Sequence, residues 1–315
     1  MVNAGGSPAQ SMRNSLDLAR HAERWGYKRY WLAEHHNIKG IASTATPVLI
    51  GFIAAGTSTI RVGSGGIMLP NHSPLVIAEQ FGTLDTLYPG RIDLGLGRAP
   101  GTDRVTAMAL RRNLDGPTAE DFPTAVKELM DYFDPKSRNS VKAVPGEGLK
   151  IPIWILGTSL FGAQLAAMLG LPFAFASHFA PGYFERAIEI YHENFQPSEV
   201  LKKPYVMAGV NVVVADSDTE ANRLFTSIQL RALGMLRGIH DLLQPPVNDI
   251  DNIWTDLEKY AVSERLKYSF VGSPERVREG LDSFLNRTPV DEIMAVSHMY
   301  DHAARLRSYE ILSSI

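Results

Sequence analysis

The amino-acid sequence predicts an α/β fold built from parallel strands, and a (β/α)₈ TIM barrel is the architecture that it favours. Short β-branched or aromatic segments alternate along the chain with longer segments of helical spacing. Such alternation requires helical crossovers between parallel strands, which a doubly wound open sheet would also contain. The barrel is favoured because no shift in composition divides the 315 residues. We therefore expect a single domain over residues 1–315.

The alternation predicts seven strands, each followed by a helix. The strands are expected at 29–33, 60–63, 91–97, 151–157, 173–177, 205–215 and 293–297. The helices are expected at 15–26, 44–55, 73–87, 120–133, 159–169, 183–195 and 218–237, with two more that begin at Ser273 and Asp301. The least regular stretch, residues 238–267, follows the longest strand. We interpret it as an insertion, either a lid over one end of the barrel or a surface excursion.

Composition excludes several classes of protein. The formal net charge is −3, which disfavours a nucleic-acid partner or an anionic membrane partner held by bulk electrostatics. The chain has no cysteine, so disulfides, thiolate nucleophiles and thiolate metal sites are excluded. The longest weakly polar run, residues 45–56, is too short to cross a bilayer. We expect a cytoplasmic protein without a membrane or nucleic-acid partner.

Unusual residues follow the predicted strands, where a barrel places its functional groups. The first such group is Glu34-His35-His36. We expect no metal there, because adjacent strand residues point to opposite faces and no His-x-His spacing occurs. Two interpretations stay open: histidines hydrogen-bonded to backbone carbonyls, or a His35 that acts as a general acid or base or contacts substrate.

Two glycine-rich segments lie at other strand ends. Residues 63–66 (Gly-Ser-Gly-Gly) indicate a bulge or a close approach of backbone to a ligand, although a bend at a barrel corner would also use glycine. Residues 95–101 lack the spacing of a dinucleotide-binding fingerprint. The segment Gly157-Thr158-Ser159 is typical of an anion site at a helix N-terminus, with Arg98 as a candidate cation, although Ser159 could act only as an N-cap.

Four segments together resemble one known family. Residues 29–36, 60–70, 88–101 and 174–181 are similar to segments of the bacterial-luciferase-like flavin monooxygenases, and the resemblance extends from about Ser15 to the C-terminus. The resemblance implies a TIM barrel that binds reduced FMN delivered by a separate flavin reductase. It also implies that O₂ reacts at the flavin C4a carbon to give a peroxide, which oxygenates a small organic substrate such as an aldehyde.

The resemblance also implies roles for particular residues. Gly65 and Gly66 match a strand bulge against the flavin ring, where relatives have a non-proline cis peptide. Arg98 matches a phosphate-binding arginine, and Gly162 replaces a hydroxyl of the luciferases' phosphate loop. The implied cofactor-binding residues are Gly65, Gly66, Arg98, Leu156, Thr158, Ser159 and Gly162.

His35 matches the catalytic histidine of the luciferases, so the resemblance implies that it is a general base. Gly97 occupies the position of a reactive cysteine in the luciferases, and its presence does not argue against flavin oxygenation. The substrate-side candidates are Glu34, His178 and His298, because each follows a predicted strand.

One departure from the family and two alternatives qualify these expectations. Family members begin with a short strand that has no counterpart here, so we expect a barrel without its first strand and with a gap beside Arg29–Ala33. An F420-dependent hydride transferase would have the same fold, and a non-catalytic flavin-binding protein is a further possibility. The family also implies a homodimer, for which apolar residues of the helix at 73–87 are candidates, although core packing would explain them equally well. These residues are Val76, Ile77, Phe81, Leu84 and Leu87.

Overall fold

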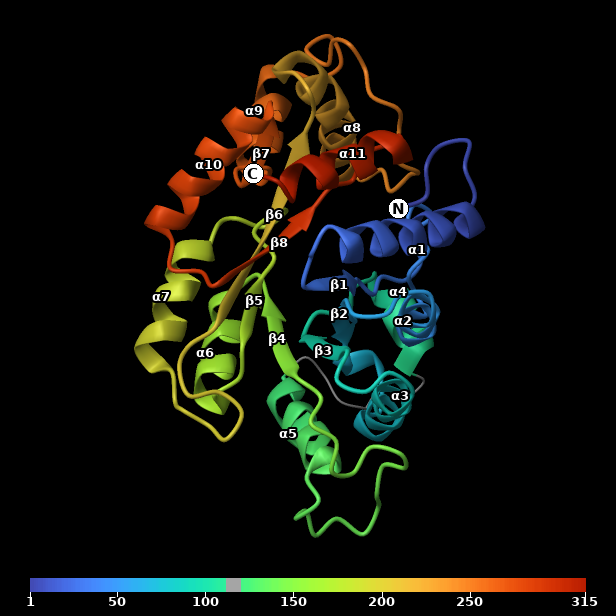
Figure 1. Ribbon diagram of the computed structural model, residues 1–315, viewed down its shortest axis with the longest axis vertical. Helices are drawn as coiled ribbons and strands as arrows, with labels where there is room; N and C mark the ends of the chain where they lie inside the picture. The colour runs from blue at the N-terminus through green and yellow to red at the C-terminus, as the bar shows by residue number, and fades with distance from the viewer. Residues whose placement is uncertain (112–119) are drawn as a thin grey trace. The chain divides into compact units, whose positions relative to one another are not determined.

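The computed structural model describes residues 1–111 and 120–315, and these residues hold eight β-strands (Figure 1). Contacts between residues group the chain into two compact units. Unit 1 contains residues 1–26, 38–42 and 157–315, and unit 2 contains residues 27–37 and 43–156. Within each unit the strands pair in parallel, so the predicted parallel α/β architecture is confirmed.

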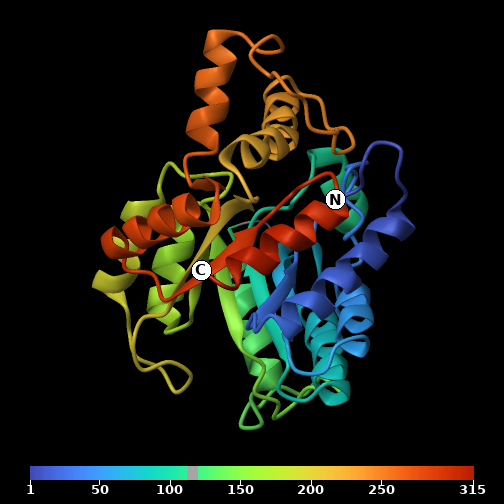
Figure 2. The same cartoon turned by 45° about the horizontal axis from the view of Figure 1, so that its top comes forward.

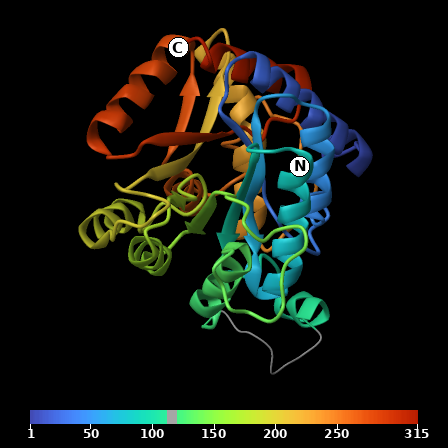
Figure 3. The same cartoon turned by 60° about the horizontal axis from the view of Figure 1, so that its bottom comes forward.

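Unit 2 is built on four strands that pair in the order β1–β2–β3–β4. They are β1 (Arg29–Leu32), β2 (Arg61–Met68), β3 (Ile92–Gly97) and β4 (Ile153–Gly157). The helices are α2 (Thr46–Ala55), the short 3₁₀ helix η1 (Leu69–Asn71), α3 (Pro74–Leu87), α4 (Arg104–Arg111) and α5 (Phe122–Phe133). Helices α2 and α3 pack beside each other against β2 and β3 (Figure 3). Every residue of β3 is buried, as expected for a strand of a parallel sheet that is covered by helices.

Unit 1 is organised around β6 (Val206–Val214), which is buried along its whole length. This strand pairs with β5 (Phe173–Phe175), β7 (Ser269–Gly272) and β8 (Glu292–Val296). The helices are α1 (Pro8–Arg24), α6 (Leu160–Leu169), α7 (Phe184–Asn194), α8 (Asp218–Leu236), α9 (Asp256–Arg265), α10 (Pro274–Arg287) and α11 (His302–Leu312). Helices α8 and α9 stand next to each other and share a buried apolar cluster (Figure 2).

The predicted count of seven strands is wrong, because the sequence reading missed β7. This strand has only four residues and pairs with the end of β6, at Asn211–Val214, whereas β8 pairs with Met207–Asn211. It lies between the stretch interpreted as an insertion, which was expected to end at residue 267, and the helix expected to begin at Ser273. Residues 1–28 hold no strand, as expected, but only α1 and an isolated bridge between Asn3 and Leu243. The expected gap beside Arg29–Ala33 stays a prediction.

Two helical segments also differ from expectation. Helix α1 begins at Pro8 rather than Ser15, because Ser7 is its N-cap and accepts a hydrogen bond from the backbone N–H of Gln10. The stretch 238–267 is less irregular than expected, since it contains α9, which starts with a capping box between Thr255 and Glu258.

In the described residues, no helix has the length and apolar character that crossing a bilayer requires.

A buried ionic cluster joins the amino ends of the first three strands. The Asp93 side chain is fully buried and accepts hydrogen bonds from Arg29 at 2.5 Å, from Arg61 at 2.6 and 2.8 Å, and from Trp31 Nε1 at 3.0 Å. Gly63 makes room for it, because a Cβ at that position would lie 2.7 Å from the Asp93 Cβ. Both carboxylate oxygens are therefore satisfied, which is the condition under which a buried charge is tolerated.

We predict that Asp93→Asn lowers the free energy of unfolding by about 3–5 kcal/mol, because the change leaves two arginines without their buried counter-charge. Urea denaturation measures this loss. The matched control is Asp216→Asn, which breaks an exposed pair with Arg307 and should leave the denaturation midpoint unchanged. Equal effects of the two variants would contradict the assignment of Asp93 as a buried anchor.

Candidate functional site

A buried carboxylate organises the loop that follows β1. Glu34 is 1% exposed, and its Oε1 lies 2.8 Å from His36 Nε2 and 2.8 Å from His72 Nε2. Its Oε2 accepts a hydrogen bond from the backbone N–H of Met68 at 3.1 Å. The carboxylate therefore connects the loop after β1 to the end of β2 and to the segment that precedes α3.

The electrostatics of Glu34 follow from these contacts. Burial alone would raise the pKa of the Glu34 carboxyl, but the hydrogen bonds from His72 and His36 and from the Met68 N–H outweigh burial, and the pKa is lowered. Glu34 is consequently ionised at neutral pH. Both Glu34 oxygens have partners within unit 2. The expectation that Glu34 contacts substrate stays a prediction.

His35 is half-buried and is held by a backbone carbonyl. Its Nδ1 lies 3.3 Å from the Gly101 carbonyl oxygen, which can only accept, so Nδ1 carries the proton in this contact. In a neutral ring this tautomer leaves a lone pair on Nε2. Gly101 has φ +64°, and a Cβ there would lie 3.1 Å from the Glu34 carbonyl oxygen. Glycine therefore permits both the turn and the close approach to His35.

The expected bulge and cis peptide in β2 are confirmed. The peptide bond between Gly65 and Gly66 is cis, and the register between β2 and β3 shifts between Ser64 and Ile67. A Cβ on Gly66 would lie 2.8 Å from the Gly95 carbonyl oxygen, so no other residue fits without backbone movement. The Ser64 hydroxyl is 2.9 Å from the same oxygen and accepts from the Gly95 N–H at 3.0 Å. The bulge is thus fixed against β3 by hydrogen bonds.

The other unit 2 residues expected to bind cofactor lie at the carboxyl ends of β3 and β4. Arg98 comes directly after β3 and is half-buried, and Leu156 is the half-buried fourth residue of β4. Gly97 is the last residue of β3, and a Cβ there would lie 3.0 Å from the Met68 sulfur. The β2 and β3 ends therefore lie close to each other, as parallel pairing requires.

Thr158, Ser159 and Gly162 lie in unit 1 at the start of α6. Ser159 occupies the N-cap position, but its hydroxyl accepts no hydrogen bond from the first turn of the helix. The interpretation of Ser159 as a side-chain N-cap is therefore not supported. Gly162 is buried, and a Cβ on Gly157 would lie 3.6 Å from its Cα. This arrangement suits an anion, because amides of a helix N-terminus and two hydroxyls occur together.

His178 and His298 also belong to unit 1. The His178 ring lies against Gly209, where a Cβ would be 2.7 Å from Nδ1, and its carbonyl accepts from Asn211 Nδ2 at 2.6 Å. Burial lowers the pKa of His298 well below its ordinary value, and the positive charge of Arg231 lowers it further. His178 contributes to the same shift, so the two rings lie within electrostatic range of each other. His298 is therefore neutral at physiological pH.

We predict that His298→Gln weakens the pH dependence of stability. Because the pKa of His298 is lowered in the folded protein, the unfolded chain binds a proton more readily as the pH falls below 6.5. The free energy of unfolding should therefore decrease as the pH falls through this range, by up to about 1.4 kcal/mol per pH unit. Urea denaturation across this range measures the slope, which should be shallower in the variant. The same slope in wild type and variant would contradict the lowered pKa of His298.

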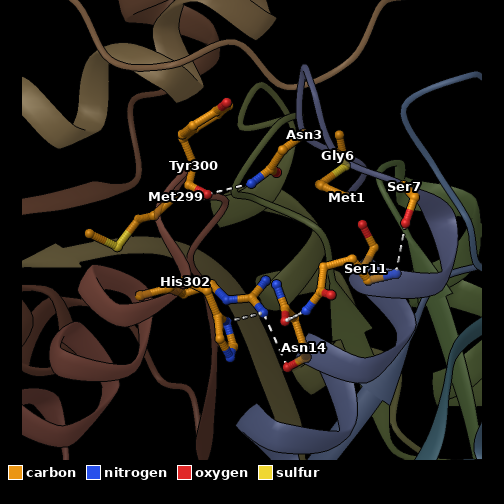
Figure 4. Close-up of a pocket in the computed structure, with 11 residues that line it drawn as sticks. Met1, Asn3, Gly6, Ser7, Ser11, Asn14, Met299, Tyr300 and His302 are labelled. Carbon is orange, nitrogen blue, oxygen red and sulfur yellow. Dashed lines mark hydrogen bonds between the residues drawn. The ribbon is translucent and has the colours of Figure 1, made fainter.

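A polar pocket of unit 1 holds none of the expected site residues. It lies between the N-terminal segment and α11, and Asn3, Ser7, Asn14 and Tyr300 line it (Figure 4). The Asn3 amide donates to the Tyr300 carbonyl, and Arg305 bridges the Asn14 carbonyl at 3.4 Å and His302 Nδ1 at 3.2 Å.

The sequence analysis did not identify His72 as a site residue. His72 follows the end of β2 by four residues, and its Nε2 contacts Glu34.

Comparison with known protein families identifies the family of this chain. A family model described as luciferase-like monooxygenase matches residues 1–292, so the chain belongs to this family of oxidoreductases. A luciferase-like monooxygenase of Escherichia coli (strain K12) is 55% identical over 315 residues, which are 100% of this chain and 94% of the relative.

Two more proteins are informative. The crystal structure of apo-MsnO8 has a TM-score of 0.89 and 37% identity, and the match covers 99% of this chain and 95% of that one. An N-acetyl-S-alkylcysteine monooxygenase of Bacillus subtilis (strain 168) is 39% identical over 181 residues, which are 56% of this chain and 54% of the relative. The recognised family resemblance is therefore confirmed.

Proposed function

We propose that the protein is an FMN-dependent monooxygenase that uses O₂ to oxygenate a small organic substrate, with reduced FMN supplied by a separate reductase. The observation that carries the proposal is the bulge at Gly65–Gly66 in β2, the strand that pairs with β1 and so lies next to the strand that precedes His35. Membership of the luciferase-like monooxygenase family supports the same reaction class.

The residues present suit a flavin. Gly65 and Gly66 expose backbone without side chains, so a planar ring can approach the bulge closely. Arg98 supplies a fixed positive charge, and the hydroxyls of Thr158 and Ser159 with the first amides of α6 suit a phosphate. We propose that the unit 2 residues Gly65, Gly66, Arg98 and Leu156 contact FMN. Thr158, Ser159 and Gly162 of unit 1 stay predicted phosphate-binding residues. When bound, reduced FMN supplies the electrons that activate O₂.

His35 is the proposed general base. Its Nδ1 proton points to the Gly101 carbonyl, so Nε2 is the atom that can take a proton from a reacting group. Two contacts fix the loop that carries His35. The Glu34 carboxylate accepts a hydrogen bond from the Met68 N–H, and the Gly101 carbonyl accepts one from His35 Nδ1. We assign His178 and His298 to the substrate side, where a neutral His298 would accept or donate one hydrogen bond.

The substrate class is open to a direct test. The Bacillus subtilis relative acts, by its name, on N-acetyl-S-alkylcysteines, which contain a thioether sulfur. A thioether and an aldehyde are therefore the two probes that we propose for the first assays. Neither the thioether sulfur nor the aldehyde carbonyl carries a formal charge, so the site does not have to neutralise one.

We predict that His35→Ala reduces product formation by about 10²- to 10⁴-fold, the usual contribution of a general base, while reduced FMN still binds. The assay supplies chemically reduced FMN and O₂ and measures oxygenated thioether or acid by mass spectrometry. The exposed His240→Ala variant is the matched control and should react like wild type.

Two results would contradict this assignment. Product formation by His35→Ala at the wild-type rate would exclude His35 as the base. Binding of reduced FMN by the wild type without any product from either probe would favour the non-catalytic flavin-binding alternative.

We also propose a homodimer. Of the five apolar residues expected on the helix at 73–87, Ile77, Phe81 and Leu84 are buried in the core of unit 2, whereas Val76 is 43% and Leu87 is 63% exposed. On the neighbouring helix α2, Val48 is 71% and Phe52 is 41% exposed. Core packing explains the first three, and the four exposed side chains support a surface for a second copy.

A further inference from the structure

We propose that Glu34, His36 and His72 form a binding site for one divalent first-row transition-metal ion, such as Zn²⁺ or Fe²⁺. The site lies in unit 2, on the loops that follow β1 and β2. It does not depend on the proposed flavin chemistry, and its test does not require turnover.

The geometry of the ligand atoms carries the proposal. Glu34 Oε1 lies 2.8 Å from each of the two histidine Nε2 atoms, and all three atoms lie within 4.8 Å of one another. Metal–nitrogen and metal–oxygen bonds of about 2.0–2.2 Å place neighbouring ligands roughly 3 Å apart. An ion can therefore enter this cluster with small side-chain movements.

The sequence spacing alone did not indicate this set. Glu34 and His36 are two residues apart, and the third ligand comes from a residue 38 positions away in sequence. Only the parallel pairing of β1 with β2 brings His72 to the loop after β1. The metal that the sequence analysis disfavoured was one bound by Glu34, His35 and His36, and His35 is not part of the present set.

Surrounding hydrogen bonds hold the ligands in place. The Met68 N–H fixes the orientation of the Glu34 carboxylate through Oε2. The backbone of His36 donates to the Gly101 carbonyl at 3.4 Å and accepts from the Thr102 hydroxyl at 3.0 Å. The His72 N–H donates to the Leu69 carbonyl at 3.0 Å. Outer contacts of this kind are what orient metal ligands in proteins.

Charge and access also fit a cation. With both imidazoles neutral, the cluster has one buried negative charge, which attracts a cation. The Glu34 side chain is 1% exposed, but those of His36 and His72 are 12% and 26% exposed. The histidines thus give an ion an entry path, and solvent can reach the ligand positions that the protein leaves open. Two histidines and one carboxylate are typical of Zn²⁺ and Fe²⁺ sites with open positions.

The alternative is that each imidazole Nε2–H donates a hydrogen bond to Glu34 Oε1. In that case each Nε2 carries hydrogen and has no lone pair for a metal. Metal binding would require both rings to change tautomer, so the two states exclude each other. A titration with metal therefore distinguishes them.

The experiment is an anaerobic titration of chelator-treated full-length protein with Co²⁺, followed by visible d–d absorption, and with Zn²⁺, followed by calorimetry. The proposal predicts one equivalent bound and a metal-dependent rise in melting temperature. His72→Ala should weaken binding at least about 100-fold, because it removes a ligand outright. His72 is the most exposed member of the set, so this variant is expected to fold, and its melting temperature without metal checks that it does.

The matched control is His240→Ala, an exposed histidine of unit 1 that should bind metal like wild type. Equal binding by wild type and His72→Ala, or no binding by folded wild type, would overturn the proposal and leave the histidines as hydrogen-bond donors to Glu34. Loss of binding in both His72→Ala and His36→Ala, with the control unchanged, would establish the site.

Discussion

The buried Glu34 carboxylate is the constraint on which the proposed active end of unit 2 depends. It contacts two imidazoles and one backbone amide, and these partners come from the loop after β1 and from residues 68–72. Loss of these partners would leave a buried carboxylate without hydrogen bonds and would destabilise the folded protein. The hydrogen bonds to Glu34 therefore hold the segments together. His35 is adjacent to Glu34 in sequence, so the contacts of Glu34 also position the backbone of the loop that carries His35, while the Gly101 carbonyl holds its ring.

The opposite ends of the same strands serve stability. Asp93, Arg29 and Arg61 lie near the amino ends of β1, β2 and β3, whereas Glu34, Gly65 and Arg98 lie toward or beyond their carboxyl ends. In barrels of parallel strands, the carboxyl ends carry function and the amino ends carry stability. The buried ionic cluster and the proposed site of unit 2 would follow this division within a single set of strands. Changes at Asp93 and at His35 should therefore separate in their effects on folding and on chemistry.

The sequence predicted the fold where the local signal was strong. Long apolar strands such as 205–215 and helices with clear caps, such as those that begin after Ser273 and Asp301, occur where expected. The strand β7 was missed because it lies between the stretch interpreted as an insertion and a predicted helix. The start of α1 was missed because the cap Ser7 precedes a polar first turn.

The candidate site was predictable in part. The bulge at Gly65–Gly66 could be read from glycines inside a strand, and its cis peptide from the family resemblance. The contact between His72 and Glu34 could not, because it depends on the register between two strands and on a loop conformation that no local pattern encodes. The role of Gly101 depends on a positive φ and on its distance from His35, and both are visible only in three dimensions.

The most direct test of the proposed flavin chemistry is an anaerobic fluorescence-quenching titration of the protein with photoreduced FMN, oxidised FMN and F420 in parallel. The account predicts that reduced FMN binds most tightly and that reduced riboflavin, which lacks the phosphate, binds more weakly. Preferential binding of F420 would contradict the monooxygenase assignment and favour hydride transfer on the same fold. The absence of binding to any of these flavins would contradict the proposed cofactor site itself.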